Sequence, residues 1–216
     1  MLTACLGKPG APLTILCLGA HCDDLEIGAG GTILRLLAEH PGSTVHWVVF
    51  SSDAGREAEA REAAAEVLAG ARAATVEINA FRESFFPQAG AAIKEHFEKV
   101  KASIRPDVVL THRTADLHQD HRTVGELTWN TFRDHLILEF EIPKYEGDLG
   151  QPNFFVPLPR ALAEKKVALL LRCFPSQARR RWFRAGTFES ILRLRGVECN
   201  APDGYAEAFH VRKLVM

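Results

Sequence analysis

The sequence lacks the segments that carry a chain into or across a membrane. Residues 1–10 have neither the basic start nor the apolar stretch of a signal peptide. No apolar run approaches the roughly 20 residues that a helix needs to span a bilayer. We therefore expect a cytoplasmic protein with no integral membrane segment.

Closely spaced cysteine pairs are also missing. The five cysteines stand at positions 5, 17, 22, 173 and 199. Thiolate zinc sites and the disulfide frameworks of secreted proteins use short paired spacings instead. We expect five reduced thiols, and any metal site must be built from other residue types.

The chain as a whole lacks a charge excess, because its formal net charge is −1. The charge is nevertheless unevenly spread. Residues 160–216 hold 12 Lys and Arg against 5 Asp and Glu, a balance of +7, which leaves −8 for residues 1–159. The basic part could face an anion such as a phosphate, a nucleotide or an anionic lipid surface, or it could be a solvated helix face. We expect no nucleic-acid partner.

A chain of 216 residues with 47% apolar and 25% charged residues is typical of one soluble domain. We predict a single domain over residues 1–216, with a less regular part from about residue 136. Apolar runs typical of strands alternate with helical patterns. The expected strands are 13–20, 45–50, 75–81 and 107–112, and the expected helices are 32–40, 56–68 and 93–104. This alternation predicts a Rossmann-like, doubly wound α/β fold with a mostly parallel sheet and helices on both faces.

The later part of the chain is harder to assign. Residues 140–145 could form a strand, a proline-rich stretch spans 152–159, a helix is expected over about 160–171, and a closing strand near 206–215. Arg179, Arg180 and Arg181 are most simply a solvated helix face. The aromatic segment 145–155 either shapes a substrate pocket or packs into the core.

Two polar clusters follow strands of the predicted sheet. His21, Asp23 and Asp24 come directly after the first strand, and residues 116–121, Asp-Leu-His-Gln-Asp-His, follow the strand that ends at His112. Ligands of doubly wound folds bind at the carboxyl ends of the strands. Imidazole and carboxylate suit Zn²⁺, and a catalytic zinc keeps three protein ligands and leaves a position to water, whose pKa it lowers to about 7. A remaining carboxylate and histidine could serve as base and acid.

Each feature also has a purely structural interpretation. Paired aspartates before a helix often cap it, and Asp120 could cap the helix that follows it. The glycines at 28, 30 and 31 could suggest a phosphate loop, but their spacing is not Gly-x-Gly-x-x-Gly, and three nearby carboxylates would repel a pyrophosphate. Close packing of a helix on a strand explains these glycines better. Arg56 is a candidate for binding a substrate hydroxyl or phosphate, and it could equally begin a solvated helix.

The two clusters resemble the signature motifs of one enzyme family. Ala20-His21-Cys22-Asp23-Asp24 is similar to the Ala-His-Pro-Asp-Asp motif of the LmbE-like, or PIG-L-like, N-acetylglucosaminyl deacetylases, and residues 118–121 match its His-x-Asp-His motif. Weaker similarity extends through the helix that contains Arg61 and Glu62, and through Lys165-Lys166, Ser176-Gln177 and residues 205–209. Cys22 stands where the family often has proline, which should loosen the turn without changing the chemistry.

The resemblance implies a role for each motif residue. His21, Asp24 and His121 would hold zinc, and Asp23 would be the general base. His118 would stabilise the oxyanion or protonate the leaving amine, and Asp120 would position His118 through a hydrogen bond.

The function that the resemblance implies is zinc-dependent removal of an N-acetyl group from an amino sugar, its glycoconjugate or its sugar nucleotide. Its partner would be a small-molecule amino sugar. Two alternatives stay open: a metal-dependent amidase acting on a thiol-conjugated or antibiotic glycoside, and a nucleotide-binding module without catalysis. The same ligands could also accept iron(II) or cobalt(II). The sequence leaves the oligomeric state open, a homo-oligomer included.

Overall fold

The computed structural model describes residues 3 and 5–215. Seven strands form one sheet in the order β3-β2-β1-β4-β5-β7-β6. The strands are β1 (Thr14–Gly19), β2 (Thr44–Val49), β3 (Ala73–Ile78), β4 (Val108–His112), β5 (Leu136–Phe140), β6 (Phe154–Pro157) and β7 (Ala206–His210). The first five pair in parallel, whereas β7 runs antiparallel to both β5 and β6. The predicted doubly wound, mostly parallel sheet is confirmed.

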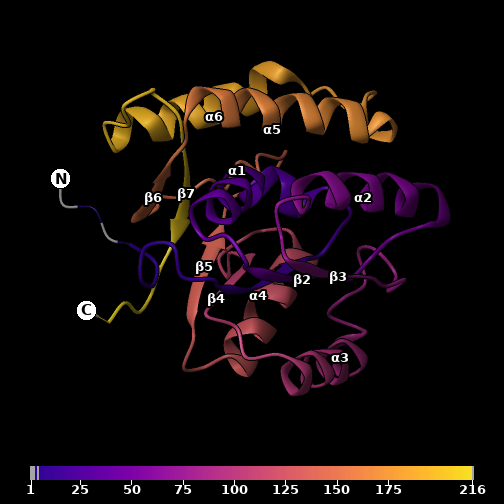
Figure 1. Ribbon diagram of the computed structural model, residues 1–216. Coiled ribbons are helices and arrows are strands. Elements are labelled where there is room, and N and C mark those ends of the chain that lie inside the picture. Colours follow the sequence, from indigo (N-terminus) through magenta and orange to yellow (C-terminus); the bar gives the residue numbers. More distant parts are fainter. Residues whose placement is uncertain (1–2, 4, 216) are drawn as a thin grey trace.

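Helices cover both faces of this sheet (Figure 1). They are α1 (Asp24–Glu39), α2 (Ala54–Val67), α3 (Gly90–Ser103), α4 (Gln119–Thr131), α5 (Arg160–Cys173) and α6 (Ala185–Glu198), with a short 3₁₀ turn η1 (Pro175–Gln177). Helices α1 and α2 pack on one face, and α3 and α4 on the other. Helix α5 packs over α1 and α2, and α6 packs on α5 and on β7 (Figure 1). Among the described residues, none of these helices has the length and apolar character needed to cross a membrane.

The core lies on both sides of the sheet because successive side chains of a strand point to opposite faces. Along β1, Ile15 and Cys17 join the cluster under α1 and α2, while Leu16 and Leu18 join the cluster under α3 and α4. All four are completely buried. A strand buried on both faces explains the unbroken apolar run that leads up to His21.

Helix α1 begins earlier than the sequence pattern indicates. We expected a loop through Gly31 and a helix from Thr32, but α1 begins at Asp24. The glycines inside it lie against neighbouring elements: a Cβ on Gly28 would collide with the ring of Phe140 in β5, and one on Gly31 would collide with Leu158. Their close packing, expected from the sequence, lets a glycine-rich segment remain helical despite the low helix propensity of glycine. The first turn of α1 therefore sits tightly on the sheet.

The C-terminal half closes the sheet in a way that the sequence indicated only in part. The expected closing strand exists but ends at His210, and residues 154–157 of the proline-rich stretch form the edge strand β6. A short strand that ends in a proline is typical of a sheet edge, where one side of the strand needs no hydrogen-bond partners. Residues 179–181 lie in turns after η1 rather than on a helix.

Candidate metal centre

The two motifs meet where β1 and β4 end. These strands are adjacent and parallel, so their carboxyl ends open at the same edge of the sheet. Chain connections leave β1 and β4 in opposite directions, since the order is β3-β2-β1-β4-β5. This is the topological switch point at which doubly wound folds bind their ligands. His21 follows β1, and α4 begins seven residues after the last residue of β4 and carries His121.

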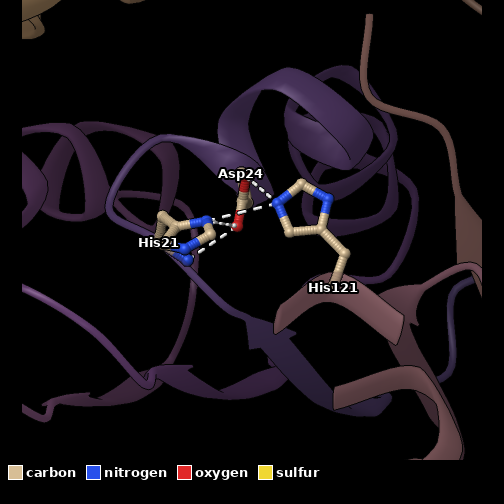
Figure 2. A group of neighbouring side chains, drawn as sticks. All are labelled: His21, Asp24 and His121. Atoms are coloured by element: carbon tan, nitrogen blue, oxygen red, sulfur yellow. Dashed lines mark hydrogen bonds and ion pairs between the residues drawn. The ribbon is translucent and has the colours of Figure 1, made fainter. Parts of the chain in front are cut away.

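Three predicted ligands point toward one another (Figure 2). His21 Nδ1 lies 3.2 Å from His121 Nε2, and the Asp24 carboxylate places one oxygen 3.4 Å from His21 Nδ1 and the other 3.4 Å from His121 Nε2. Ligands about 2.0–2.2 Å from a tetrahedral zinc would be about 3.3–3.6 Å apart. The observed spacing therefore fits a divalent cation. All three side chains are buried.

Carboxylates hold the outer nitrogens of both imidazoles. His21 Nε2 lies 3.2 Å from Asp120 Oδ2, and His121 Nδ1 lies 3.1 Å from Asp116 Oδ2. Metal-binding histidines commonly donate their second N–H to a carboxylate, which fixes the tautomer and turns the other nitrogen to the ion. Both candidate histidines have this arrangement, which independently supports the fit of the donor set to a metal.

The electrostatics of the two histidines differ. Burial lowers the pKa of His121 to about 3, assisted by the neighbouring His112, so its imidazole is neutral and can offer a lone pair. Burial also acts to lower the pKa of His21, but Asp24 and Asp120 outweigh it and raise that pKa to about 10. The carboxylates around His21 thus favour a positive charge at this point, and a bound cation would supply it.

Asp23 stands apart from the three candidate ligands. It occupies the N-cap position of α1, yet its side chain accepts no capping hydrogen bond. Its Oδ1 instead accepts a hydrogen bond from Arg56, 3.1 Å away. Burial, and then the charge of Asp24, raise the pKa of Asp23 to about 6. A buried carboxylate with such a pKa is suited to act as a general base near neutral pH.

Arg56 binds protein carboxylates at this site. Its guanidinium pairs with Asp23 at 3.1 Å and with Glu83 at 3.6 Å. Arg56 does line the cavity, as expected of a substrate-binding residue, but the contacts seen are those of a residue that holds the Asp23 carboxylate in place.

His118 is the N-cap of α4. Its Nδ1 accepts the backbone N–H of Asp120 at 3.3 Å, so in the neutral ring the proton is on Nε2. The side chain lines the cavity beside His21 and His121. An imidazole N–H in this position can donate to a developing oxyanion or a leaving nitrogen.

Asp120 differs from the role that the resemblance implied. Its carboxylate does not orient the His118 ring; it contacts His21 and accepts the backbone N–H groups of Ser84, at 2.6 Å, and Phe86, at 3.1 Å. The reason is geometric: Asp120 lies in the first turn of α4, completely buried against the loop before α3. Among the described residues, the Asp120 carboxylate thus forms hydrogen bonds with groups other than His118.

Three further residues belong to the site and were given no role from the sequence. His112, the last residue of β4, lies 3.1 Å from Asp24 Oδ2, and its ring stacks on His121 with centroids 4.0 Å apart. Asp116 holds His121, and Lys144 Nζ lies 3.0 Å from the Asp116 carboxylate. The signal for His112 was its place at a strand end, and that for Asp116 was its place in the second polar cluster. No local pattern marks Lys144.

Cys22 is turned away from the candidate ligands. Its Sγ donates to the Ser51 carbonyl at 3.5 Å, and burial raises the pKa of the thiol to about 11. Cys22 does not belong to the group formed by His21, Asp24 and His121.

A cavity of about 210 Å³ opens above these groups. It is lined by His21, Asp23, Asp24, Arg56, Glu83, His118, His121, Ile142, Lys144, Tyr145, Glu146, Gln177, Arg180 and Trp182. The candidate metal ligands form part of this lining, and the segments after β5 and after η1 supply another part. A small polar molecule can thus reach the centre.

Fold and site together define a doubly wound α/β protein with a buried histidine–aspartate centre suited to a divalent cation. The chain belongs to the PIG-L family, described as GlcNAc-PI de-N-acetylase, whose family model matches residues 16–132. This range contains both motifs. A search of curated proteins gave no match.

Several solved structures share the fold. A conserved protein from Thermus thermophilus superposes with a TM-score of 0.72 at 19% identity, covering 94% of this chain and 96% of that one. An N,N'-diacetylchitobiose deacetylase from Pyrococcus horikoshii gives 0.66 at 19% identity, covering 95% and 84%. The 4-carboxy-2-hydroxymuconate hydratase GalB from Pseudomonas putida gives 0.70 at 18% identity, covering 94% and 98%. One fold thus carries different reactions, so function must be argued from the site.

Proposed function

We propose that this protein is a zinc-dependent hydrolase that removes the N-acetyl group from an amino sugar, either free or within a glycoconjugate or sugar nucleotide. One observation carries the proposal: two adjacent aspartates have separate surroundings. Asp24 lies between two imidazoles at ligand spacing, whereas Asp23 is held by Arg56 outside that group with a raised pKa. A metal ligand and a general base are thus available side by side. Membership of a de-N-acetylase family supports the amide as the bond that is cleaved.

His21, Asp24 and His121 would hold the ion. When bound, zinc polarises a carbonyl oxygen and makes water a nucleophile near neutral pH. Asp23 would take a proton from the attacking water as it adds to the acetamide carbon. Nε2–H of His118 would hydrogen-bond to the developing oxyanion, and the proton taken up by Asp23 would pass to the departing nitrogen. The C–N bond breaks, and acetate and the free amine leave.

The remaining polar residues would act by positioning. Arg56 holds the Asp23 carboxylate, Asp120 and Asp116 fix the two ligand imidazoles, and Lys144 holds Asp116. Preorganised groups need no rearrangement when charge develops in the transition state. We therefore assign Asp120 a positioning role through His21, in place of the role through His118.

The P. horikoshii structure, a deacetylase of N,N'-diacetylchitobiose by its description, supports an amino sugar as substrate. An amide of a thiol-conjugated or antibiotic glycoside would meet the same catalytic groups, and product analysis separates these substrates. A phosphate-binding module without catalysis fits poorly, because Asp23, Asp24 and Glu26 are buried together at the first turn of α1.

The test is a screen of N-acetylated sugars, glycosides and sugar nucleotides for acetate release, with zinc, iron(II) or cobalt(II) added to metal-free protein. With a substrate in hand, Asp23→Asn should lower kcat by about 10²–10⁴-fold while the protein retains one equivalent of metal. Asp134→Asn, a change at an exposed residue outside the site, is the control and should keep full activity. Full activity in Asp23→Asn would refute the assignment of the base. Stoichiometric metal without acetate release from any substrate would refute the proposed reaction.

A further inference from the structure

Part of the cavity lining contains none of the candidate ligands, and we call it the outer wall. It is formed by Lys144, Tyr145 and Glu146, which follow β5, and by Gln177, Arg180 and Trp182, which belong to or follow η1. None of these side chains has a part in the proposed amide hydrolysis apart from Lys144, which positions Asp116. A substrate whose acetamide lies at the metal centre would place its remaining part against this wall.

Two of the three cations that line the cavity are already paired with protein carboxylates. Arg56 pairs with Asp23 and Glu83, and Lys144 pairs with Asp116 at 3.0 Å and with Asp148 at 2.5 Å. The third, Arg180, forms no ion pair with any residue that the structure describes. Its guanidinium can therefore pair with an anionic group of a ligand without first leaving a protein carboxylate.

The surroundings of Arg180 reinforce this charge. It is the middle member of an exposed run, Arg179 to Arg181. On the neighbouring helix α2, Glu57 pairs with Arg61, Glu59 accepts hydrogen bonds from Ser176, and Glu66 pairs with Arg172. The basic excess found in residues 160–216 thus reaches the mouth of the cavity. Among the described residues of this outer wall, Glu146 is the single acidic one.

The segment that carries Arg180 is fixed at both ends. The Arg180 N–H donates to the Gln177 carbonyl at 2.9 Å, and the Phe183 N–H donates to the Arg180 carbonyl at 3.2 Å. Phe183 is buried between Phe174 and Phe188. Trp182 packs on Phe183 and Phe188 and also lines the cavity. The backbone of Arg180 is therefore held in place, with an aromatic surface two residues away.

We propose that the outer wall is a subsite for an anionic group, a phosphate or a carboxylate, carried by the part of the substrate beyond the amino sugar, and that Arg180 binds it. Trp182 and Tyr145, the latter 70% exposed, offer apolar faces to the sugar or to the linking group. A guanidinium offers forked N–H donors that match the oxygens of phosphate and carboxylate. This inference rests on the proposed deacetylase function, because it names the substrate class of the same site.

The test compares matched substrates that differ in one charge: a methyl glycoside of N-acetylglucosamine, its 1-phosphate, and a glycoside with a carboxylate-bearing aglycone. The wild-type protein should prefer the anionic compounds. Arg180→Gln should raise KM for them by about ten- to a hundredfold, since it removes a charged hydrogen bond, and leave kcat, and both constants for the neutral glycoside, within about twofold. Arg180→Lys should recover part of the loss. Glu146→Gln should lower KM for the anionic compounds.

Arg179→Gln is the matched control, because it removes the same charge from the same exposed run at a position that does not line the cavity. Equal losses in the Arg179 and Arg180 variants would show a general charge effect and overturn the subsite, as would equal losses for neutral and anionic substrates.

Calorimetric titration of the sugar phosphate and the neutral glycoside into Asp23→Asn protein tests the subsite without turnover. Equal affinity for both ligands would overturn the subsite, and tighter phosphate binding without any acetate release by the wild type would preserve it while refuting the deacetylase. Comparison of the free sugar phosphate with its lipid-linked form in detergent separates a soluble source of the anion from a membrane source.

Discussion

Helix α1 contacts two buried polar clusters whose charges are satisfied in different ways. At its first turn, Asp24 lies among His21, His112 and His121, where nitrogen and oxygen atoms face one another at 3.1–3.4 Å. One turn later, Lys166 Nζ of α5 donates to the Ile27 carbonyl at 2.6 Å and pairs with Glu207 of β7 at 2.5 Å.

The second cluster is complete within the protein. The two oxygens of Glu207 accept the backbone N–H groups of Gly31, at 2.8 Å, and Thr32, at 2.6 Å. In an uninterrupted α-helix, the Gly31 N–H and the Ile27 carbonyl would pair with each other; here each has a side-chain partner from the ion pair. The Lys166–Glu207 pair therefore holds the middle of α1. The cluster at the first turn instead collects lone pairs that a cation can share, and this is the difference between a structural cluster and a binding site.

Removing one predicted ligand should have the largest effect. His121→Ala leaves two ligands, so we expect loss of stoichiometric metal and a fall in kcat of about 10³-fold or more, because the ion contributes several kcal/mol to the transition state. Metal analysis of the purified variant and acetate release measure the two effects. The fold should persist, since the two cores lie elsewhere, and circular dichroism checks this. A variant that kept one tightly bound equivalent of metal would contradict the ligand assignment.

Breaking the second cluster should lower the stability of the fold and leave metal binding unchanged. Lys166→Met leaves a buried carboxylate without its cation, and the free energy of unfolding should fall by about 3–5 kcal/mol, measured by urea denaturation. The folded fraction should still bind one metal ion. Lys165→Met is the matched control: its side chain is exposed, and the change should stay within about 0.5 kcal/mol. Equal stability of the two variants would show that the ion pair does not hold α1.

Replacing a carboxylate that holds a ligand imidazole should have an intermediate effect, which falls on zinc affinity. Asp116→Asn weakens the hold on His121, so the dissociation constant for zinc should rise about 10–100-fold with little loss of stability. Asp148→Asn is the control, because it breaks the other ion pair of Lys144 without touching His121. Competition with a zinc chelator measures both affinities. The role of Asp116 would be refuted if both variants bound zinc as the wild type does.

The sequence predicted that the two polar clusters meet, because each follows a strand end, and adjacent parallel strands end at one edge. The choice of His21, Asp24 and His121 within these clusters came from the family resemblance. The sequence did not predict the contacts of Asp120, because these depend on backbone N–H groups of Ser84 and Phe86 in a loop without a sequence pattern. The strand β6 was not predicted because its four residues, the last of them a proline, are too few to show an alternating pattern. Sequence periodicity thus predicts long buried elements, whereas the contacts of side chains with loop backbones become visible only in the structure.

A histidine far from the metal ligands completes the comparison. Carboxylates surround His21, whereas His210, at the end of β7, lies near Arg113 and Arg195. Burial, and then these two guanidinium groups, lower the pKa of His210 to about 4 from the usual value near 6.5. The unfolded chain then binds more protons between these values, so His210 should make stability fall as the pH drops from about 6.5 to about 4, and have no effect on its pH dependence above 6.5. His210→Gln removes this titration, so its free energy of unfolding should fall less steeply over that range in urea denaturation at several pH values. Parallel pH profiles for the variant and the wild type would contradict the depressed pKa.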